Sequence, residues 1–208
     1  MDSTAPEIWK KEILRLHRRI AKMESQHNLH VFYGSSSVRL WVNMVKDLAP
    51  LNVLNLGFGG SSFEWCLYYF DELFEQVEPS HLILYAGEND ISHGTPSNRV
   101  LFNFERLFEK ALREYPQADI TVISLKPSLK RTDLIPKIQD VNRLISRFIH
   151  NHPKGKFVDV FSHMLDGQGN PRGDLFLSDG LHMNKEGYKI WTAAMRSYFK
   201  LPQRNHST

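Results

Sequence analysis

The sequence alternates between short apolar runs and longer segments with helical spacing, and this order most restricts the possible folds. Apolar runs followed by turn residues cover residues 29–33, 53–56, 81–85, 120–125 and 157–160. Helical patterns lie between and after them, near residues 63–76, 98–115, 134–151 and 185–199. Strands that alternate with helices form parallel sheets covered on both faces. The sequence therefore predicts a three-layer α/β/α sandwich around a mostly parallel five-stranded sheet.

The length and composition indicate one ordinary folded domain. The chain has 208 residues, of which 41% are hydrophobic and 24% charged, close to the averages of globular proteins. No internal repeat, low-complexity tract or linker divides it. We therefore expect a single domain over residues 1–208, with a long glycine-rich loop over residues 162–179.

The first segment, residues 6–26, has an apolar stripe at helical spacing. The stripe consists of Trp9, Ile13, Leu16, Ile20 and Met23, with basic residues around it. Most amphipathic helices bury such a stripe against their own domain, and we expect the same here. A seam in a homodimer and an anionic membrane surface are the alternatives.

Charge and cysteine content limit the expected partners and location. The net charge of +3 comes partly from a basic cluster in the first segment, so nucleic acid is not an expected partner. The single cysteine, Cys66, excludes an intramolecular disulfide. No signal-peptide pattern and no apolar run of about 18 residues are present, which predicts a cytoplasmic protein without membrane insertion. A chain with a trimmed leader would look the same.

Three glycine-containing turns follow predicted strands. They are Gly34-Ser35-Ser36-Ser37, residues 55–60 with Gly60 at the end, and Gly87-Glu88-Asn89-Asp90. The ligand crevice of an open parallel sheet lies outside the carboxyl ends of its strands, so these turns should open on the same edge. This edge is where we expect the chemistry of the protein.

The residues available at that edge suit nucleophilic catalysis by serine. A serine hydroxyl needs a base to take its proton, and the base needs a third group to orient it. His182 and Asp179, three residues apart near the C-terminus, can supply the base and the orienting carboxylate. The backbone N–H groups of Ser36 and Gly60, with the Asn89 side-chain amide, can stabilise an oxyanion.

These blocks, in this order, resemble the Ser-Gly-Asn-His (SGNH, or GDSL) hydrolase family. The matching positions are Ser36 in the nucleophile block, Gly60, the Gly-x-Asn-Asp block with Asn89, and the terminal Asp179-Gly180-Leu181-His182 block. A subgroup of small acylhydrolases shares segments like Gly34 to Trp41 and Lys126 to Ser128. The resemblance implies a flavodoxin-like fold, a catalytic triad of Ser36, Asp179 and His182, and an oxyanion hole from Ser36, Gly60 and Asn89.

One block departs from the usual family pattern, because Gly-Asp-Ser is replaced by Gly34-Ser35-Ser36. Three adjacent serines therefore compete for the nucleophile's role, and we assign it to Ser36 because it follows the glycine by two residues. Lys126, Arg39 and Arg131 could bind an anionic substrate group, but solvated or structural ion pairs are the expected use.

The predicted function is a serine esterase that hydrolyses small-molecule carboxylic esters, with short acyl groups, through an acyl-enzyme. An acyltransferase using the same triad and a catalytically inactive member that binds a glycan or protein are the alternatives. No cofactor is expected, because Ser62 stands where the last glycine of a dinucleotide fingerprint would be. No metal site is expected either, since the ten histidines form no His-Glu-x-x-His motif.

Overall fold

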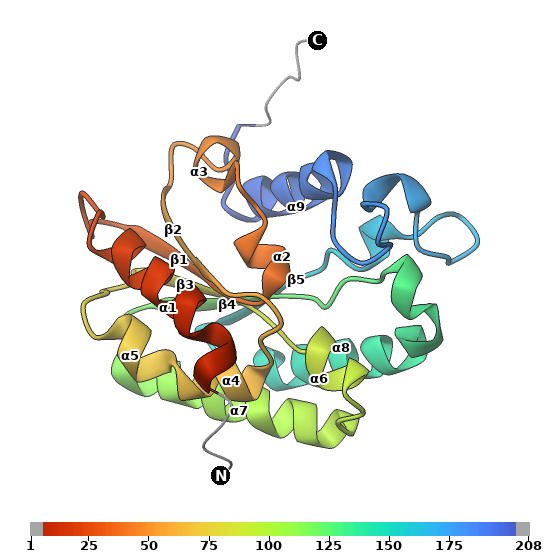
Figure 1. Cartoon of the computed structure of the whole chain (residues 1–208), viewed down its shortest axis with the longest axis horizontal. Coiled ribbons are helices and arrows are strands. Elements are labelled where there is room, and N and C mark those ends of the chain that lie inside the picture. The colour runs from red at the N-terminus through yellow and green to blue at the C-terminus, as the bar shows by residue number, and fades with distance from the viewer. Residues whose placement is uncertain (1–5, 203–208) are drawn as a thin grey trace.

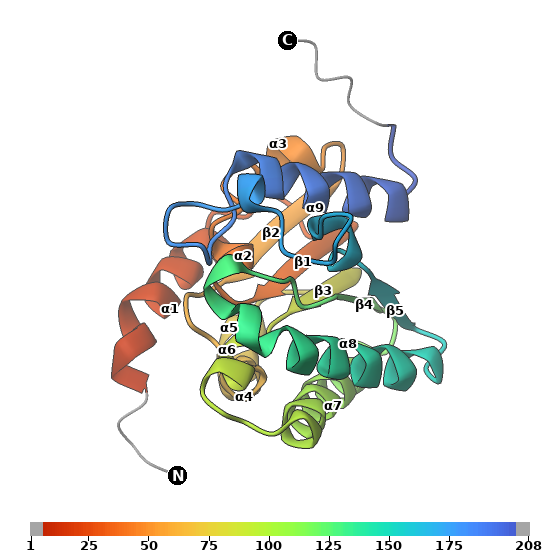
Figure 2. The same cartoon turned by 90° about the vertical axis from the view of Figure 1, so that its right-hand side faces the viewer.

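The structure, a computed structural model, describes residues 6–202 and contains a parallel five-stranded sheet (Figure 1). The strand order is β2-β1-β3-β4-β5, and every neighbouring pair is parallel. The strands are β1 (Leu29–Gly34), β2 (Asn52–Gly57), β3 (His81–Tyr85), β4 (Asp119–Ile123) and β5 (Gly155–Val158). With helices on both faces, this architecture confirms the predicted three-layer sandwich (Figure 2).

Side chains alternate between the two faces of the sheet, and both faces are covered. In β1, Val31 and Tyr33 enter the larger core, whereas Phe32 enters the smaller one. In β3, Leu82 and Leu84 share the larger core, whereas Ile83 and Tyr85 pack on the opposite face. Because both faces are buried, these strands are continuous apolar runs rather than alternating patterns.

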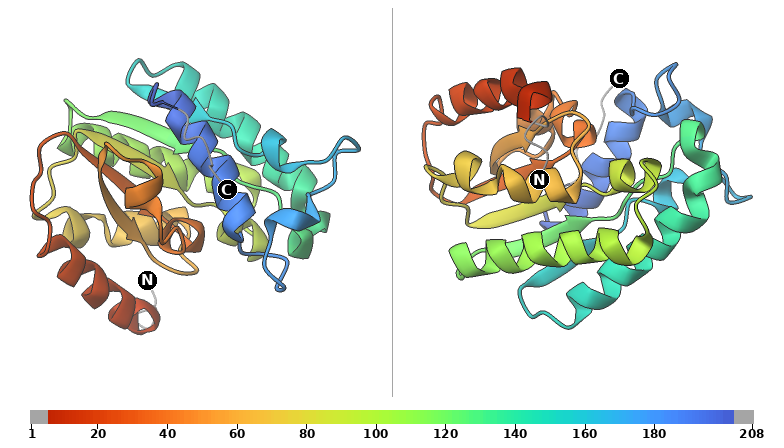
Figure 3. Two further views of the ribbon diagram at one scale, coloured as in Figure 1. Left: turned by 90° about the horizontal axis from the view of Figure 1, so that it is seen from above. Right: turned by 60° about the horizontal axis from the view of Figure 1, so that its bottom comes forward.

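The helices divide between the two faces. The larger core is covered by α1 (Pro6–Ile20), α4 (Phe63–Tyr68), α5 (Phe70–Phe74), α7 (Ser97–Glu114) and α8 (Ile135–His150). The smaller core is covered by α2 (Ser36–Arg39), α3 (Met44–Asp47) and α9 (Lys185–Tyr198). The short helix α6 (Glu88–Ser92) follows β3, and three 3₁₀ helices, η1 (Leu129–Leu134), η2 (Ser162–Met164) and η3 (Gly173–Leu175), lie in later loops. Figure 3 shows α9 and the loops before it on one side and α7 and α8 on the other.

Two helices differ from the sequence-based boundaries. The first helix ends at Ile20 rather than near residue 26, because its hydrogen bonds tighten from the i−4 to the i−3 carbonyl at Lys22 and Met23. The segment predicted as one helix over residues 63–76 is two helices that meet at Tyr69. The break turns Phe70 and Phe74 into the core, where their rings stack at 4.3 Å.

Helix α1 is fixed to the loop after β2. Trp9, Ile13, Leu16 and Ile20 of its apolar stripe are buried in the larger core, and Trp9 Nε1 donates a hydrogen bond to Gly59 O at 2.5 Å. Gly59 N in turn donates to the Glu12 carboxylate at 2.6 Å. Both contacts hold the residue that precedes Gly60. Among residues 6–202, no helix has the length and apolar character needed to cross a membrane.

Candidate active site

The turns after β1, β2 and β3 meet at the carboxyl edge of the sheet. Ser35 N donates to Tyr85 O at 2.9 Å, and Phe58 N donates to Gly34 O at the same distance. Gly34 has a φ of +148°, and a Cβ at this position would lie 1.8 Å from Tyr85 O. Glycine is therefore required at this position, because only it permits such a close approach of two backbones.

Ser36 is the accessible member of the three adjacent serines. Ser35 and Ser37 are only 2% and 3% exposed, whereas Ser36 is partly exposed. Ser36 begins α2, with Ser35 in an extended conformation as its N-cap. The N–H groups in the first turn of a helix have no intrahelical acceptor. Both the hydroxyl and the backbone amide of Ser36 are thus available to a ligand at this edge.

Asp179 and His182 form a hydrogen-bonded pair in the loop before α9. Asp179 Oδ2 lies 2.6 Å from His182 Nδ1, and Oδ1 accepts from the backbone N–H groups of Leu181 and His182 at 2.9 and 3.0 Å. The hydrogen bond from the imidazole, followed by those from the backbone, holds the pKa of Asp179 well below its ordinary value. The carboxylate therefore stays ionised and fixes the ring through Nδ1, which leaves Nε2 for another partner.

Backbone contacts hold the loop that carries this pair. Leu177 N donates to His182 O at 2.8 Å, and Lys130 N donates to Gly180 O at 2.9 Å. Phe176 and Met183 form an isolated antiparallel bridge. The loop is thus closed on itself and attached to η1.

A buried ion pair also anchors this loop. The sequence predicts solvated or structural ion pairs for Lys126, but it does not indicate the partner or the link to the histidine loop. The Lys126 and Glu88 side chains are 1% and 6% exposed, and Lys126 Nζ lies 2.9 Å from Glu88 Oε1. The same Nζ donates to Leu181 O at 2.9 Å, and Tyr85 OH donates to the other Glu88 oxygen. A lysine amid the apolar residues after β4 was the available signal, since unpaired buried charges are costly. The network joins the end of β3 to the residue before His182.

Asn89 lies beside the turn that contains Gly60. Its Nδ2 donates to Ser61 O at 3.0 Å, and its Oδ1 accepts from Arg131 at 3.1 Å. Gly60 has a φ of +73°, which favours glycine, and is exposed. One of the two Asn89 amide hydrogens is used in the turn, so the other is left for a ligand.

The nucleophile turn and the histidine loop are linked through α9. Tyr188 OH, six residues after His182 in the sequence, donates to Ser37 O at 2.9 Å. In the described part of the chain, the Ser36 hydroxyl and the His182 ring are not hydrogen-bonded to each other. Such contacts are often long without substrate and shorten in the reacting complex. Within residues 6–202, no group of three or more His, Cys, Asp or Glu side chains could hold a metal ion.

Comparison with known families identifies the class of protein. A model of the GDSL-like Lipase/Acylhydrolase family matches residues 28–190, which include every block described above. The chain belongs to this family. A comparison with curated proteins gave no significant match.

Solved structures of GDSL-family and esterase proteins share the fold. A GDSL-like lipase from Bacteroides thetaiotaomicron is 20% identical, with a TM-score of 0.76 over 94% of this chain and 97% of that one. The esterase EstA from Pseudoalteromonas sp., in a structure inhibited by monoethylphosphonate, is 20% identical, with a TM-score of 0.64 over 83% and 99%. A family 3 carbohydrate esterase from Clostridium thermocellum is 16% identical, with a TM-score of 0.66 over 81% and 93%. At these identities the likeness concerns the fold alone.

Asp90, the last residue of the Gly-x-Asn-Asp block in this GDSL-family chain, should make stability depend on pH. Burial raises its pKa to about 6, although a hydrogen bond from Phe63 N opposes the shift. The folded state therefore holds this proton more tightly than the unfolded state, so the free energy of unfolding falls as pH rises from about 4 to about 6. Asp90→Asn keeps an acceptor for Phe63 N and removes the titration.

We expect urea unfolding to reveal this difference. Relative to the unmodified protein, the stability of Asp90→Asn should increase by on the order of 2 kcal/mol between pH 4 and pH 7. Asp133→Asn, which removes an exposed carboxylate, is the control: it measures how the same substitution alters the pH dependence of stability at an exposed position. A difference that stays constant over this pH range would contradict the assignment to Asp90.

Proposed function

We propose that this GDSL-family protein is a serine esterase that hydrolyses small carboxylic esters through an acyl-enzyme. The observation that carries the proposal is the Asp179–His182 pair, whose side chains lie 2.6 Å apart. Helix α9, which follows this pair, is hydrogen-bonded to the turn that contains the accessible serine of the nucleophile block. Ser36 is the proposed nucleophile, His182 the general base and Asp179 the residue that orients it.

In the proposed reaction, Ser36 Oγ attacks the ester carbonyl while His182 Nε2 takes the hydroxyl proton. The tetrahedral intermediate collapses, the bond to the leaving alcohol breaks, and His182 returns the proton to that alcohol. Water then attacks the acyl-enzyme with the same base, which releases the acid and restores Ser36. The ionised Asp179 stabilises the imidazolium that forms in each half of the reaction.

The oxyanion of each tetrahedral intermediate needs fixed donors. The proposed donors are the backbone N–H groups of Ser36 and Gly60 and the second hydrogen of Asn89 Nδ2. The hydrogen bonds of Asn89 to Ser61 and Arg131 support this role, because they fix the orientation of the amide before substrate binds. Donors that need no reorganisation during the reaction stabilise the transition state most.

Packing around the site favours a small acyl group. Trp41, Phe63 and Trp191, three of the large aromatic residues near the blocks, are at most 1% exposed and belong to the two cores. They are therefore not free to line a long acyl channel. The fold is also shared by a carbohydrate esterase, which agrees with a small ester of a polar alcohol.

A series of p-nitrophenyl esters from acetate to dodecanoate tests this proposal. We expect measurable hydrolysis, with kcat/KM highest for two to four carbons and reduced by about tenfold or more for the longest chains. Preference for dodecanoate would contradict the short-acyl assignment. Product analysis with an added acceptor alcohol identifies an acyltransferase if acyl transfer exceeds hydrolysis.

A fluorophosphonate probe distinguishes an enzyme from an inactive binding protein. Inhibition of the structurally similar EstA by monoethylphosphonate makes a phosphonate the natural reagent. The probe should label Ser36, because an activated serine hydroxyl attacks phosphorus as it attacks a carbonyl. Absence of labelling, together with absence of hydrolysis across the ester series, would contradict the proposed function.

A further inference from the structure

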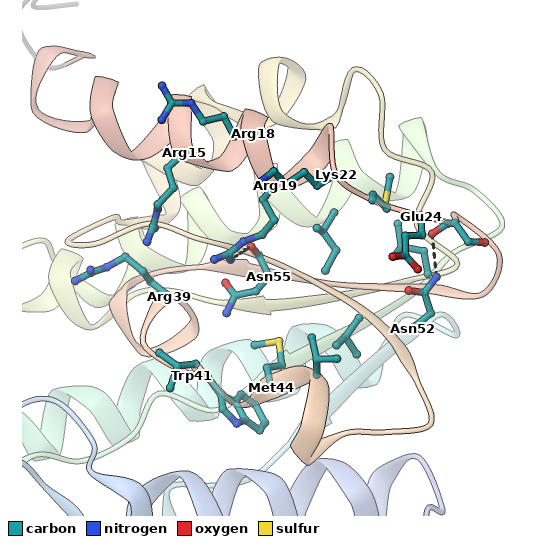
Figure 4. Close-up of a pocket in the computed structure, with 17 residues that line it drawn as sticks. Arg15, Arg18, Arg19, Lys22, Glu24, Arg39, Trp41, Met44, Asn52 and Asn55 are labelled. Atoms are coloured by element: carbon teal, nitrogen blue, oxygen red, sulfur yellow. Dashed lines mark hydrogen bonds between the residues drawn. The ribbon is translucent and has the colours of Figure 1, made fainter.

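A basic groove of about 880 Å³ lies along the open edge of the sheet, between α1 and the α2–α3 segment. β2 is the edge strand, and its residues 52–55 form the floor (Figure 4). None of the proposed catalytic or oxyanion residues lines this groove. The groove is therefore distinct from the proposed catalytic and oxyanion residues.

The charged residues that line the groove are mostly positive. Five of its 17 lining residues are basic, namely Arg15, Arg18, Arg19, Lys22 and Arg39, whereas Glu24 is the one acidic residue among them. This excess of four positive charges is larger than the net charge of +3 of the whole chain. The remainder of the protein is thus nearly neutral or slightly acidic, and an anion would be attracted to this edge.

Several guanidinium donors in the groove have no hydrogen-bond acceptor. Nε and one terminal nitrogen of Arg15, together with Nε of Arg39, are buried and unpaired within the described residues. The Glu12 carboxylate forms ion pairs with both residues, at 3.8 Å from Arg15 and 3.7 Å from Arg39, but these distances are too long for hydrogen bonds. Figure 4 shows Arg15 pointing from α1 toward the segment that carries Arg39. An oxyanion in the groove would give the exposed nitrogens of these two guanidinium groups charge-assisted hydrogen bonds, which the single Glu12 carboxylate does not supply.

The positive charges in the groove also repel one another. Arg19 donates a hydrogen bond to Asn55 O at 2.5 Å, which joins α1 to the strand at the floor of the groove. Burial and then the positive charge of Arg15 lower the pKa of Arg19. A bound anion would relieve both effects, because it stabilises the charged form of each guanidinium.

The wall opposite α1 is apolar. Its accessible surface belongs to Val42 and Val45, which are 84% and 67% exposed, whereas Trp41 and Met44, which also border the groove, are buried. Exposed apolar side chains facing a row of arginines suit a ligand with an anionic head and an apolar body. The volume of the groove is within the range of small-molecule sites.

We propose that this groove binds a phosphate monoester joined to an apolar body. The phosphate contacts the exposed part of the Arg15 and Arg39 guanidinium groups, whose side chains are 42% and 28% exposed, and the apolar part lies on Val42 and Val45. Phosphate is favoured over a carboxylate because it offers three acceptor oxygens and up to two negative charges to several guanidinium groups. The head can belong to a soluble metabolite or to a membrane lipid.

Calorimetric titration of the full chain with octyl phosphate tests the soluble case. We expect saturable binding that is stronger than binding of inorganic phosphate and absent with 1-octanol. Arg15→Gln and Arg39→Gln should each raise Kd by about tenfold or more, because each removes a charge-assisted hydrogen bond. Arg113→Gln, the same change on the exposed face of α7, should leave Kd within about twofold.

Sedimentation with vesicles of phosphatidic acid in phosphatidylcholine tests the lipid case. Arginine-dependent sedimentation without binding of octyl phosphate would identify a lipid headgroup as the source of the phosphate. Arg18→Gln and Lys22→Gln change exposed residues of the rim, so they keep the test valid if an inner-groove variant fails to fold. Absence of binding in both assays, or binding unchanged in every groove variant, would overturn the proposal. Because no hydrolysis is measured, this result is independent of the esterase assignment.

Discussion

Replacing Ser36 by alanine should lower kcat for p-nitrophenyl acetate by about 10⁴-fold or more, with little change in thermal stability. The reason is that no acyl-enzyme can form without the hydroxyl, whereas the partly exposed side chain contributes little to the core. Steady-state kinetics and fluorophosphonate labelling of the purified variant measure the effect. Labelling should disappear together with hydrolysis.

Ser35→Ala and Ser37→Ala are the matched controls for this prediction. Both remove one hydroxyl from the same turn, but both side chains are buried and should affect stability more than chemistry. We expect each control to keep kcat within about tenfold of the unmodified protein. If Ser36→Ala stayed active while either control lost activity and labelling, the nucleophile would be the other serine.

Lys126→Met should destabilise the protein and also impair the histidine loop. Removing one partner of a buried ion pair leaves the other charge unpaired, which costs about 3–5 kcal/mol. In this variant the Glu88 carboxylate would be buried without its cationic partner, and Leu181 O, beside His182, would lose its hydrogen-bond donor. Urea unfolding measures the first effect. A fall in kcat at unchanged KM, measured on the folded fraction, reports the second.

The double variant Lys126→Met/Glu88→Gln separates these two effects. It removes the unpaired charge, so it should regain part of the lost stability, but Leu181 O still lacks its donor and kcat should stay low. Lys189→Met breaks an exposed pair with Glu186 and should change stability by no more than about 0.5 kcal/mol. Full recovery of kcat in the double variant would show that the lysine acts on stability alone.

Much of the fold could be predicted from the sequence, because both faces of the sheet are buried. The five apolar runs correspond to β1–β5 within a few residues, and β3 covers residues 81–85 as predicted. The long helices α7, α8 and α9 contain enough turns for their apolar stripe to be visible. Helices α2, α3 and α6 have four or five residues, which is too few to show a helical periodicity in the sequence. Local hydrogen bonds determine where they form.

The candidate site could be predicted only where its parts are adjacent in the sequence. Asp179 and His182 are three residues apart, so a single glycine turn suffices to join them. The contacts of Lys126 with Glu88 and Leu181 span 38 and 55 residues, and no local pattern indicates which lysine finds which carboxylate. The roles of Ser36, Gly60, Asn89, Asp179 and His182 in catalysis stay predictions until the variants are measured.

The hydrogen bond from Tyr188 to Ser37 joins residues 151 positions apart. Closing a loop of this length costs conformational entropy before the contact can stabilise the fold. We therefore expect catalytic activity, which depends on this contact, to return no earlier than the helical signal during refolding, and hydrolysis of a colorimetric ester measures its return.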